Sequence, residues 1–167
     1  MTSLKLTLAA VALIGLSACD SNSSIGGSDR GGSGAGGISQ SALDPASIAY
    51  FNESIGDTVL FLVDQSTLTP EATGLLDRQA AWLLDNPKNS VTIEGHADEQ
   101  GTREYNLALG ARRAASVQNY LVSRGLTDAR IRTVTFGKER PLAVCSDEAC
   151  WSKNRRSVTL VTGGLGS

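Results

Sequence analysis

From about residue 47 onward, short apolar runs alternate with longer amphipathic stretches along the chain. The short runs are rich in valine, isoleucine and threonine, which is typical of buried strands. We expect four strands, at residues 58–63, 91–95, 131–136 and 157–161. Strands that alternate with helices predict helices packed on one face of a sheet. The expected fold class is therefore α/β (α+β), a two-layer sandwich with βαβαββ order and a mixed four-stranded sheet.

The longer stretches predict two helices. The first covers residues 70–86, with Thr69 as its N-cap and Pro70 at its first position, and a proline follows its end. The second covers residues 102–124 and stops before Gly125. Together with the strands, these helices account for most of the chain after residue 57.

The second helix separates two adjacent arginines. One face of this helix is apolar at a spacing of about 100° per residue, and it consists of Leu107, Ala111, Ala114, Val117 and Leu121. Arg112 is nearly opposite this face and is expected in solvent. Arg113 is expected at the edge of the buried face, with its side chain folded over the domain surface.

Residues 1–18 have the pattern of an export signal. Lys5 precedes an apolar run from Leu6 to Leu16, which has the length of a signal sequence and is too short to span a bilayer. The run ends in Leu-Ser-Ala-Cys, which resembles the lipobox of bacterial lipoproteins. This resemblance implies cleavage before Cys19 and acylation of that cysteine, which anchors a chain in a lipid membrane. The alternative is a plain secretory signal with an incidental cysteine.

A Ser- and Gly-rich segment separates the predicted anchor from the predicted domain. Residues 19–46 hold the cysteine and a flexible linker, whose composition buries too little apolar surface to order itself. The folded domain is expected at residues 47–162 and a short tail at residues 163–167. A flexible linker of about 25 residues spans roughly 25–30 Å on average, which suits a domain that works away from its membrane.

Composition argues against two other classes of protein. The net charge is −2 and no basic stripe is present, whereas nucleic-acid binding requires neutralised phosphates. Three cysteines and one histidine lack the close spacing of the four ligands in a structural zinc site, and we expect neither a metal nor a cofactor. Because an exported chain meets an oxidising compartment, Cys145 and Cys150 are expected to form a disulfide around a small surface loop. Trp151 is expected to pack beneath that loop, in a core role.

Polar residues that suit a ligand cluster near the ends of the predicted strands. Asp64 follows the first strand, His96 and Asp98 follow the second, and residues 154–156 precede the last. Asp98 is able to accept an ammonium group, and Arg113 is able to donate two parallel hydrogen bonds to a carboxylate. A ligand that suits both is zwitterionic, with an amino and a carboxyl group on one carbon. Such an end occurs on the side chain of diaminopimelate in bacterial wall peptide.

Four segments resemble the OmpA-like family of peptidoglycan-binding domains, and in particular its lipid-anchored members. They are FLVDQSTLTPEA, VTIEGHADEQGTREYNLALGARRAASVQNYL, FGKERP and CWSKNRRSV. The segments have the order and spacing of the family and extend over nearly the whole predicted domain. The resemblance implies a module that binds peptidoglycan non-covalently and is not an enzyme.

The resemblance also implies roles for single residues. Asp98 is implied to hold the amino group of diaminopimelate, and Arg113 its carboxylate. The other implied groove and supporting positions are Asp64, Asn106, Leu109, Asn154 and Arg155.

The arginine pair and the first loop of this expected site need separate comment. Arg155 and Arg156 both adjoin a strand, so one of them is expected to face solvent. The first loop departs from the family at Val63, where many members have an aromatic residue, and at residues 65–67.

A place in the cell envelope follows from the same resemblance. It implies a lipid anchor in the outer membrane and a domain that faces the periplasm. It also implies a role in envelope integrity and cell division, with TolB and the Tol complex as partners. Asp20 directly follows the cysteine and resembles the enteric signal for retention in the inner membrane, which is the alternative location.

Two other functions compete with wall binding. The first is an enzyme acting on peptidoglycan, because a histidine next to a carboxylate, as in His96 and Asp98, is able to act as a base. No nucleophile or metal-binding set accompanies them, so His96 is expected to be structural, with its ring hydrogen-bonded to backbone near the turn. The second is a generic surface or inner-membrane lipoprotein, which Asp20 favours.

Overall fold

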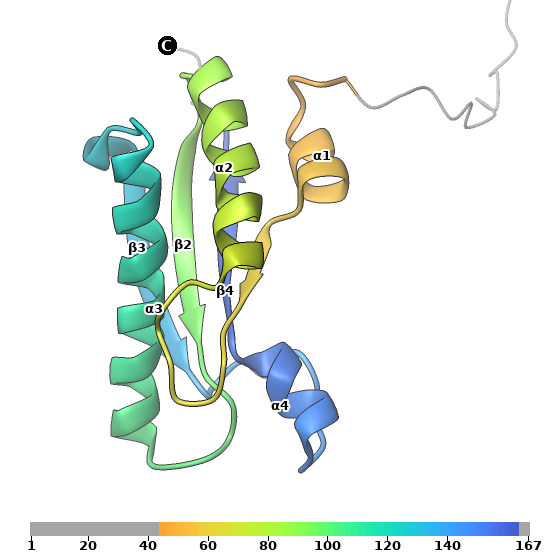
Figure 1. The fold of residues 1–167 in the computed structure, drawn as a ribbon, viewed down its shortest axis with the longest axis vertical. Helices are drawn as coiled ribbons and strands as arrows, with labels where there is room; N and C mark the ends of the chain where they lie inside the picture. The colour runs from red at the N-terminus through yellow and green to blue at the C-terminus, as the bar shows by residue number, and fades with distance from the viewer. Residues whose placement is uncertain (1–43, 164–167) are drawn as a thin grey trace, which may run out of the picture. The chain divides into compact units, whose positions relative to one another are not determined.

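The computed structural model describes residues 44–163 (Figure 1). The predicted signal, Cys19, Asp20 and nearly all of the predicted linker lie outside the described residues, as do residues 164–167. Within the described part, no helix has both the length and the apolar character needed to cross a membrane.

The sheet has four strands in the order β1-β4-β2-β3. β2 and β3 are parallel, whereas β4 lies between β1 and β2 and is antiparallel to both. The expected mixed four-stranded sheet is therefore confirmed. The strands are β1 (Thr58–Leu60), β2 (Ser90–His96), β3 (Ile131–Gly137) and β4 (Arg156–Thr162).

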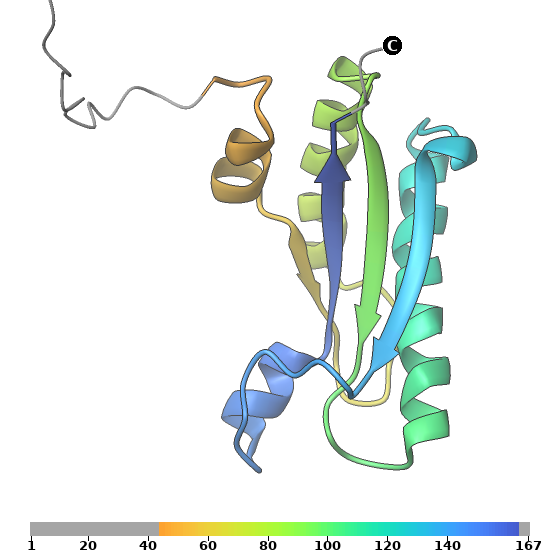
Figure 2. The same ribbon diagram turned by 180° about the vertical axis from the view of Figure 1, so that it is seen from behind.

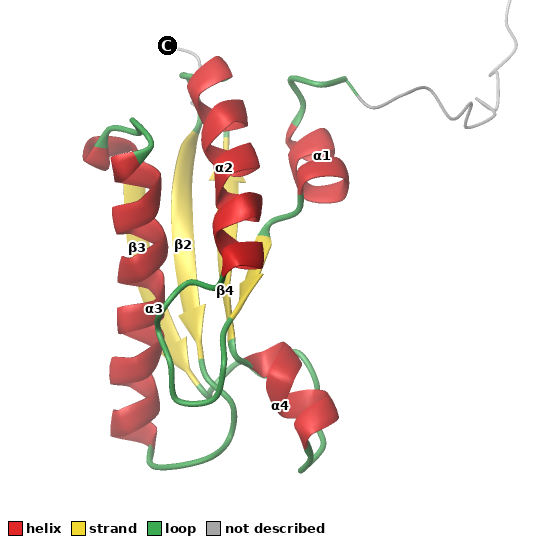
Figure 3. Cartoon of the chain, in the orientation of Figure 1, coloured by secondary structure: helices red, strands yellow, loops and turns green. Residues whose placement is uncertain are grey.

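Two helices cover one face of this sheet. They are α2 (Pro70–Asp85) and α3 (Arg103–Ser123), and they lie in front of the sheet in Figure 1 and behind it in Figure 2. Each begins at a threonine that accepts a hydrogen bond from a backbone N–H three residues later, Thr69 from Ala72 and Thr102 from Tyr105, both at 3.2 Å. The predicted two-layer sandwich is therefore confirmed. Figure 3 shows its two layers, with the helices in red and the strands in yellow.

Four short helical elements complete the domain. They are α1 (Ile48–Tyr50), the π-helix η1 (Phe51–Ile55), the 3-10 helix η2 (Asp128–Arg130) and α4 (Glu148–Asn154). The first two bring Phe51 against Trp82, with ring centroids 5.0 Å apart. The Trp82 indole N–H also donates to the Pro45 carbonyl at 2.7 Å. Contacts with the domain therefore begin at or before Pro45, ahead of the expected start at residue 47.

The first strand is shorter than predicted, because the chain leaves the sheet after Leu60. Phe61 is buried, but Leu62 and Val63 are exposed. Asp64 then adopts φ 56°, a left-handed conformation that is uncommon for a residue other than glycine. The apolar run therefore continues into a loop that turns over the end of the sheet.

The buried face of α3 also differs from the expected one. Ala111 is exposed and Leu107 is only half-buried, whereas Gly110 and Arg113 are buried together with Ala114, Val117 and Leu121. The reason is a close approach of α3 to β2, since a Cβ on Gly110 would lie 2.8 Å from the Gly95 carbonyl oxygen. This approach turns the glycine towards the sheet and brings Arg113 inside.

Candidate binding groove

A groove of about 250 Å³ lies where β2 ends. Its walls are the loop after β1, the loop after β2 and the first turns of α3 (Figure 1). It brings together four of the residues singled out from the sequence, Asp64, Asp98, Asn106 and Leu109. The structure adds four lining residues that were not among the predicted site residues: Val63, which was noted only as a departure from the family, and Gln100, Gly101 and Tyr105.

Asp98 is the largely buried carboxylate of this groove, with 8% of its surface exposed. One oxygen accepts the Gln100 backbone N–H at 3.2 Å, and the other accepts an Arg155 N–H at 3.2 Å. A carboxylate has about four lone-pair sites. Asp98 therefore keeps capacity for a further donor from the groove side.

Arg113 is fully buried and, unlike Asp98, does not line the groove. Its Nε donates to the Gln65 carbonyl at 2.8 Å, and its two terminal nitrogens donate to the carbonyls of His96 at 2.7 Å and Leu62 at 3.2 Å. The guanidinium also lies over the Phe61 ring, 5.2 Å from its centroid. The expectation of a side chain folded over the surface was wrong, because the glycine contact turns this side of α3 inward.

The charge of Arg113 survives its burial. Burial lowers the pKa of Arg113 to about 10, and the nearby Asp98 carboxylate opposes that shift. The guanidinium is therefore protonated at neutral pH. Of its five N–H donors, three are used by the loop carbonyls named above.

Tyr105 closes one side of the groove. Its hydroxyl donates to Asp64, and this hydrogen bond is the main cause of a raised Tyr105 pKa. The Arg112 guanidinium lies 5.9 Å from the Tyr105 ring centroid. The position of Tyr105 in the first turn of α3, next to Asn106, was a signal in the sequence that this residue faces the loop.

Asn106 and Leu109 shape the base of the groove. The Asn106 side-chain amide is buried and donates to the Gln100 carbonyl at 2.8 Å, which holds the loop after β2. Gly101 in that loop has φ 91°, which glycine adopts without strain. Leu109 is also buried. These residues fix the loop that carries Asp98.

Asn154 and Arg155 support the site from outside the groove lining. The Asn154 amide oxygen accepts the backbone N–H groups of Leu142 and Ala143, at 2.8 and 3.0 Å. Arg155 donates to Asp98 and to the Phe61 carbonyl. Both Arg155 and Arg156 are buried, so the expectation that one of them faces solvent was wrong. Arg156 is held at backbone carbonyls, including that of Arg140 at 3.2 Å.

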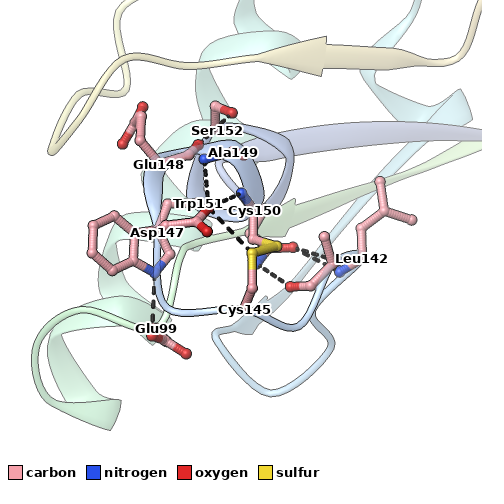
Figure 4. The surroundings of a disulfide bond; sticks show 11 residues. Glu99, Leu142, Cys145, Asp147, Glu148, Ala149, Cys150, Trp151 and Ser152 are labelled. Carbon is pink, nitrogen blue, oxygen red and sulfur yellow. Dashed lines mark hydrogen bonds between the residues drawn. A yellow bond between two sulfur atoms is a disulfide. The ribbon is translucent and has the colours of Figure 1, made fainter.

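A disulfide joins Cys145 and Cys150 at the start of α4 (Figure 4). Trp151 next to it is half-buried, and its indole N–H donates to the Glu99 carboxylate at 3.2 Å. The expected core role of Trp151 was therefore wrong, because the ring reaches across to the loop after β2. Within residues 44–163, the one cluster with metal-binding atoms is these two cysteines with Asp147, and the disulfide leaves it no thiolate.

His96 lies outside the groove lining. It is buried and stacks on Phe136 with centroids 5.4 Å apart, and among the described residues neither ring nitrogen has a hydrogen-bond partner. The expected hydrogen bond from its ring to backbone is not formed. Burial lowers the pKa of His96 to about 4, and Arg156 and Arg140 add to the shift. The imidazole is therefore neutral at pH 7 and packs as an apolar ring.

Comparisons with known proteins find similar chains. The OmpA family model matches residues 60–155. The peptidoglycan-associated lipoprotein of Rhizobium meliloti (strain 1021) is 50% identical over 161 residues, which cover 96% of this chain and 88% of the relative. The protein of the same name from Pseudomonas aeruginosa is 44% identical over 139 residues, which cover 78% and 82%.

Solved structures give a consistent result. The crystal structure of the peptidoglycan-associated lipoprotein from Burkholderia pseudomallei matches with a TM-score of 0.66 at 36% identity, over 71% of this chain and 100% of that chain. The C-terminal domain of MotB from Helicobacter pylori matches with a TM-score of 0.61 at 19% identity, over 65% and 86%. At that identity the second match shows a shared fold alone.

Proposed function

Because this chain belongs to the OmpA family, and within it to the peptidoglycan-associated lipoproteins, we propose that it binds the cell wall through the zwitterionic end of diaminopimelate. The observation that carries this proposal is the largely buried Asp98 carboxylate, which lines the groove and keeps acceptor capacity for a ligand ammonium. The ligand end has an ammonium and a carboxylate on one carbon. Asp98 lines the groove, and the positive charge of Arg113 is buried outside the lining, close enough to interact electrostatically with Asp98.

Asp98 receives the ligand ammonium in this proposal, using lone pairs that Gln100 and Arg155 leave open. Arg113 does not line the groove, and in this proposal its buried positive charge attracts the ligand carboxylate without direct contact in the structure as it stands. It also holds the carbonyls of Leu62 and Gln65, and so keeps the first loop in place. Asp64, Tyr105, Asn106 and Leu109 form the remaining walls.

The chain is a lipid-anchored protein of the cell envelope, as its lipoprotein relatives indicate. We infer that Cys19 carries the anchor and that the anchor lies in the outer membrane, so that the domain tethers this membrane to the wall. Fractionation of the two membranes tests this location, and recovery with the inner membrane would support retention by Asp20.

A protein partner is the second part of the proposal. Through its family, we infer an interaction with TolB and the Tol complex, which connects the tether to envelope integrity and cell division. Mild crosslinking followed by co-purification tests it. Absence of TolB under conditions that preserve wall binding would count against this part alone.

Binding without catalysis fits the relatives, which are lipoproteins of the wall and not enzymes. The enzyme hypothesis relied on His96 as a base next to Asp98. The imidazole is buried with a pKa of about 4 and lies outside the groove lining, so it is poorly placed to take a proton from a ligand.

Sedimentation with purified sacculi of the diaminopimelate type tests wall binding. The full chain in detergent is mixed with sacculi and pelleted, as wild type, as Asp98→Asn and as the control Asp85→Asn. Asp85 is exposed at the end of α2 and is absent from the groove lining. We expect Asp98→Asn to weaken binding about 30-fold or more, because it removes one partner of a buried charge pair.

Free diaminopimelate should also release the wild-type chain from sacculi. Equal pelleting of wild type and Asp98→Asn would show that the site is elsewhere. A wild-type chain that stays in solution would refute wall binding itself.

A further inference from the structure

Two carboxylates share the Arg155 guanidinium. One terminal nitrogen of Arg155 donates to Asp98 at 3.2 Å and also to Glu148 at 3.2 Å, and the other terminal nitrogen donates to Glu148. Arg155 itself is buried, whereas 63% of the Glu148 side chain is exposed. Of the three hydrogen bonds that Arg155 donates to carboxylates, two go to Glu148 and one goes to Asp98.

We propose that Glu148 is a positioning residue for the wall-binding groove, because it holds Arg155 and leaves the charge of Asp98 available to a ligand ammonium. This inference rests on the proposed binding of diaminopimelate by Asp98. Without Glu148, Arg155 and Asp98 form a neutral pair, and an incoming ammonium has to displace a guanidinium. With Glu148, the three groups carry a net charge of −1, and Asp98 is held by one hydrogen bond from Arg155.

The disulfide ring holds Glu148 in this position. Glu148 lies between Cys145 and Cys150, inside the ring that their bond closes (Figure 4). The Asp147 carboxylate accepts the backbone N–H groups of Ala149 and Cys150, at 2.8 and 3.3 Å, and so starts α4 at Glu148. The ring therefore fixes the backbone from which Glu148 reaches Arg155.

A second contact ties α4 to the loop of Asp98. The Trp151 indole N–H donates to Glu99, the residue directly after Asp98. Arg155 and Trp151 lie one helical turn apart and contact two consecutive residues of the groove loop. The disulfide-closed start of α4 is thus connected to the groove at two points, although neither cysteine lines it.

Replacement of Glu148 by Gln tests this role, because the positioning role and simple electrostatics predict opposite changes in wall binding. Wall peptides carry carboxylates, so removing an exposed negative charge should by itself leave binding unchanged or strengthen it. We expect Glu148→Gln to weaken sedimentation with sacculi about threefold, an effect of the size of an exposed ion pair. Glu53→Gln removes another exposed negative charge, in η1, and serves as the matched control.

A double-mutant cycle distinguishes positioning from general destabilisation. Cys145→Ser/Cys150→Ser should weaken binding to the same extent as Glu148→Gln, and the triple variant should bind no more weakly than either. Arg155→Gln should likewise abolish the effect of Glu148→Gln, provided that circular dichroism shows the variant folded. The ring variants keep the test valid if Arg155→Gln does not fold.

The outcomes separate this inference from the proposed function. One outcome is that wild type pellets, Asp98→Asn does not, and Glu148→Gln binds as well as wild type. This outcome would overturn the role of Glu148 and leave wall binding intact. Additive losses in the triple variant would also overturn it. Wild type that fails to pellet would remove both proposals together.

Discussion

At the scale of single residues, one buried guanidinium joins three segments of the chain. Arg113 donates to carbonyls in the loop after β1 and at the end of β2 while it is itself part of α3. A buried cation with several carbonyl partners is costly to remove, because the carbonyls lose their donors and the space is left open. The stability of the loops around the groove therefore depends on this side chain.

Replacement of Arg113 by Ala should lower the free energy of unfolding by about 3 kcal/mol. The matched control is Arg112→Ala at the next position, where the side chain is exposed and the expected change is within about 0.5 kcal/mol. Urea denaturation followed by circular dichroism measures both. Equal, small changes would mean that the Arg113 contacts contribute little to folding.

His96 makes stability depend on pH. Its pKa is about 4 in the folded chain and near 6.5 when unfolded, so the unfolded chain binds more protons between these values. This contribution to stability is therefore complete above about pH 6.5 and is lost as the pH falls towards 4. We expect a loss of about 1–2 kcal/mol from pH 7 to pH 5.

The variant His96→Leu should remove this pH dependence at little cost at pH 7. Neither ring nitrogen has a partner among the described residues, and Leu keeps an apolar contact with Phe136. Thermal unfolding at pH 7 and pH 5 compares the two chains. A slope as steep as that of wild type would assign the pH dependence to other groups.

Sequence reasoning was strongest where residue type implies chemistry. Asp98 was correctly predicted to lie in a loop near a helix arginine. The end of the predicted strand gives the loop, and the helical periodicity gives the position of the arginine. The burial of Arg113 was not predictable from helical periodicity, because a cation at the edge of an apolar face is ordinarily solvated. Tyr105 was missed because its contact with Asp64 depends on how the first loop folds back.

At the scale of elements, two glycines set the distance between α3 and β2. A Cβ on Gly110 would lie 2.5 Å from the Thr135 hydroxyl oxygen and 2.8 Å from the Gly95 carbonyl oxygen. No rotamer relieves such a clash, because a Cβ has a fixed position on the backbone. The helix has to move away from the sheet to accept any larger residue.

Replacement of Gly110 by Ala should therefore destabilise the fold by about 3 kcal/mol or more. Gly74 in α2 is the matched control, because a Cβ there meets nothing within 4 Å. Gly74→Ala should stabilise by about 0.5–1 kcal/mol, since alanine favours a helix. Chemical denaturation of both variants measures the contrast, and similar changes in the same direction would contradict it.

The disulfide gives a prediction for α4. Labelling of the denatured, unreduced chain should find no free thiol at Cys145 or Cys150, whereas prior reduction should expose both. The bond closes a short ring, so its loss should lower stability by only about 2 kcal/mol. Two reactive thiols without reduction would refute the bond and would also weaken the inferred role of Glu148.

The longer elements were predictable from periodicity, whereas the shorter ones were not. Both main helices have a threonine cap and enough turns for an apolar face to be visible in the sequence. α1, η1 and α4 have 3, 5 and 7 residues, too few to show a helical repeat. Their positions depend on long-range contacts such as that of Trp82 with Pro45.

At the scale of the whole domain, the layers followed from the alternation of strands and helices, but the groove did not. The groove is built from two loops and the first turns of α3, which are distant in sequence, with residues 63, 98 and 109 on its walls. A pattern of apolar positions determines which faces are buried, and it carries little information on how loops meet. The groove residues were predicted from the resemblance to a family, because periodicity alone does not show that they lie together.

The described chain begins at the opposite end of the strands from the groove (Figure 1). A pull on Asp44 against a ligand held at Asp98 would therefore run along the strands and not across them. β1 is the first strand after the pulled residue along the chain and pairs with β4 through three residues, Thr58, Val59 and Leu60. Tension in this direction shears the β1–β4 hydrogen bonds together instead of opening them one after another. In the proposed tether, this geometry places the domain in its mechanically stronger orientation when membrane and wall are drawn apart.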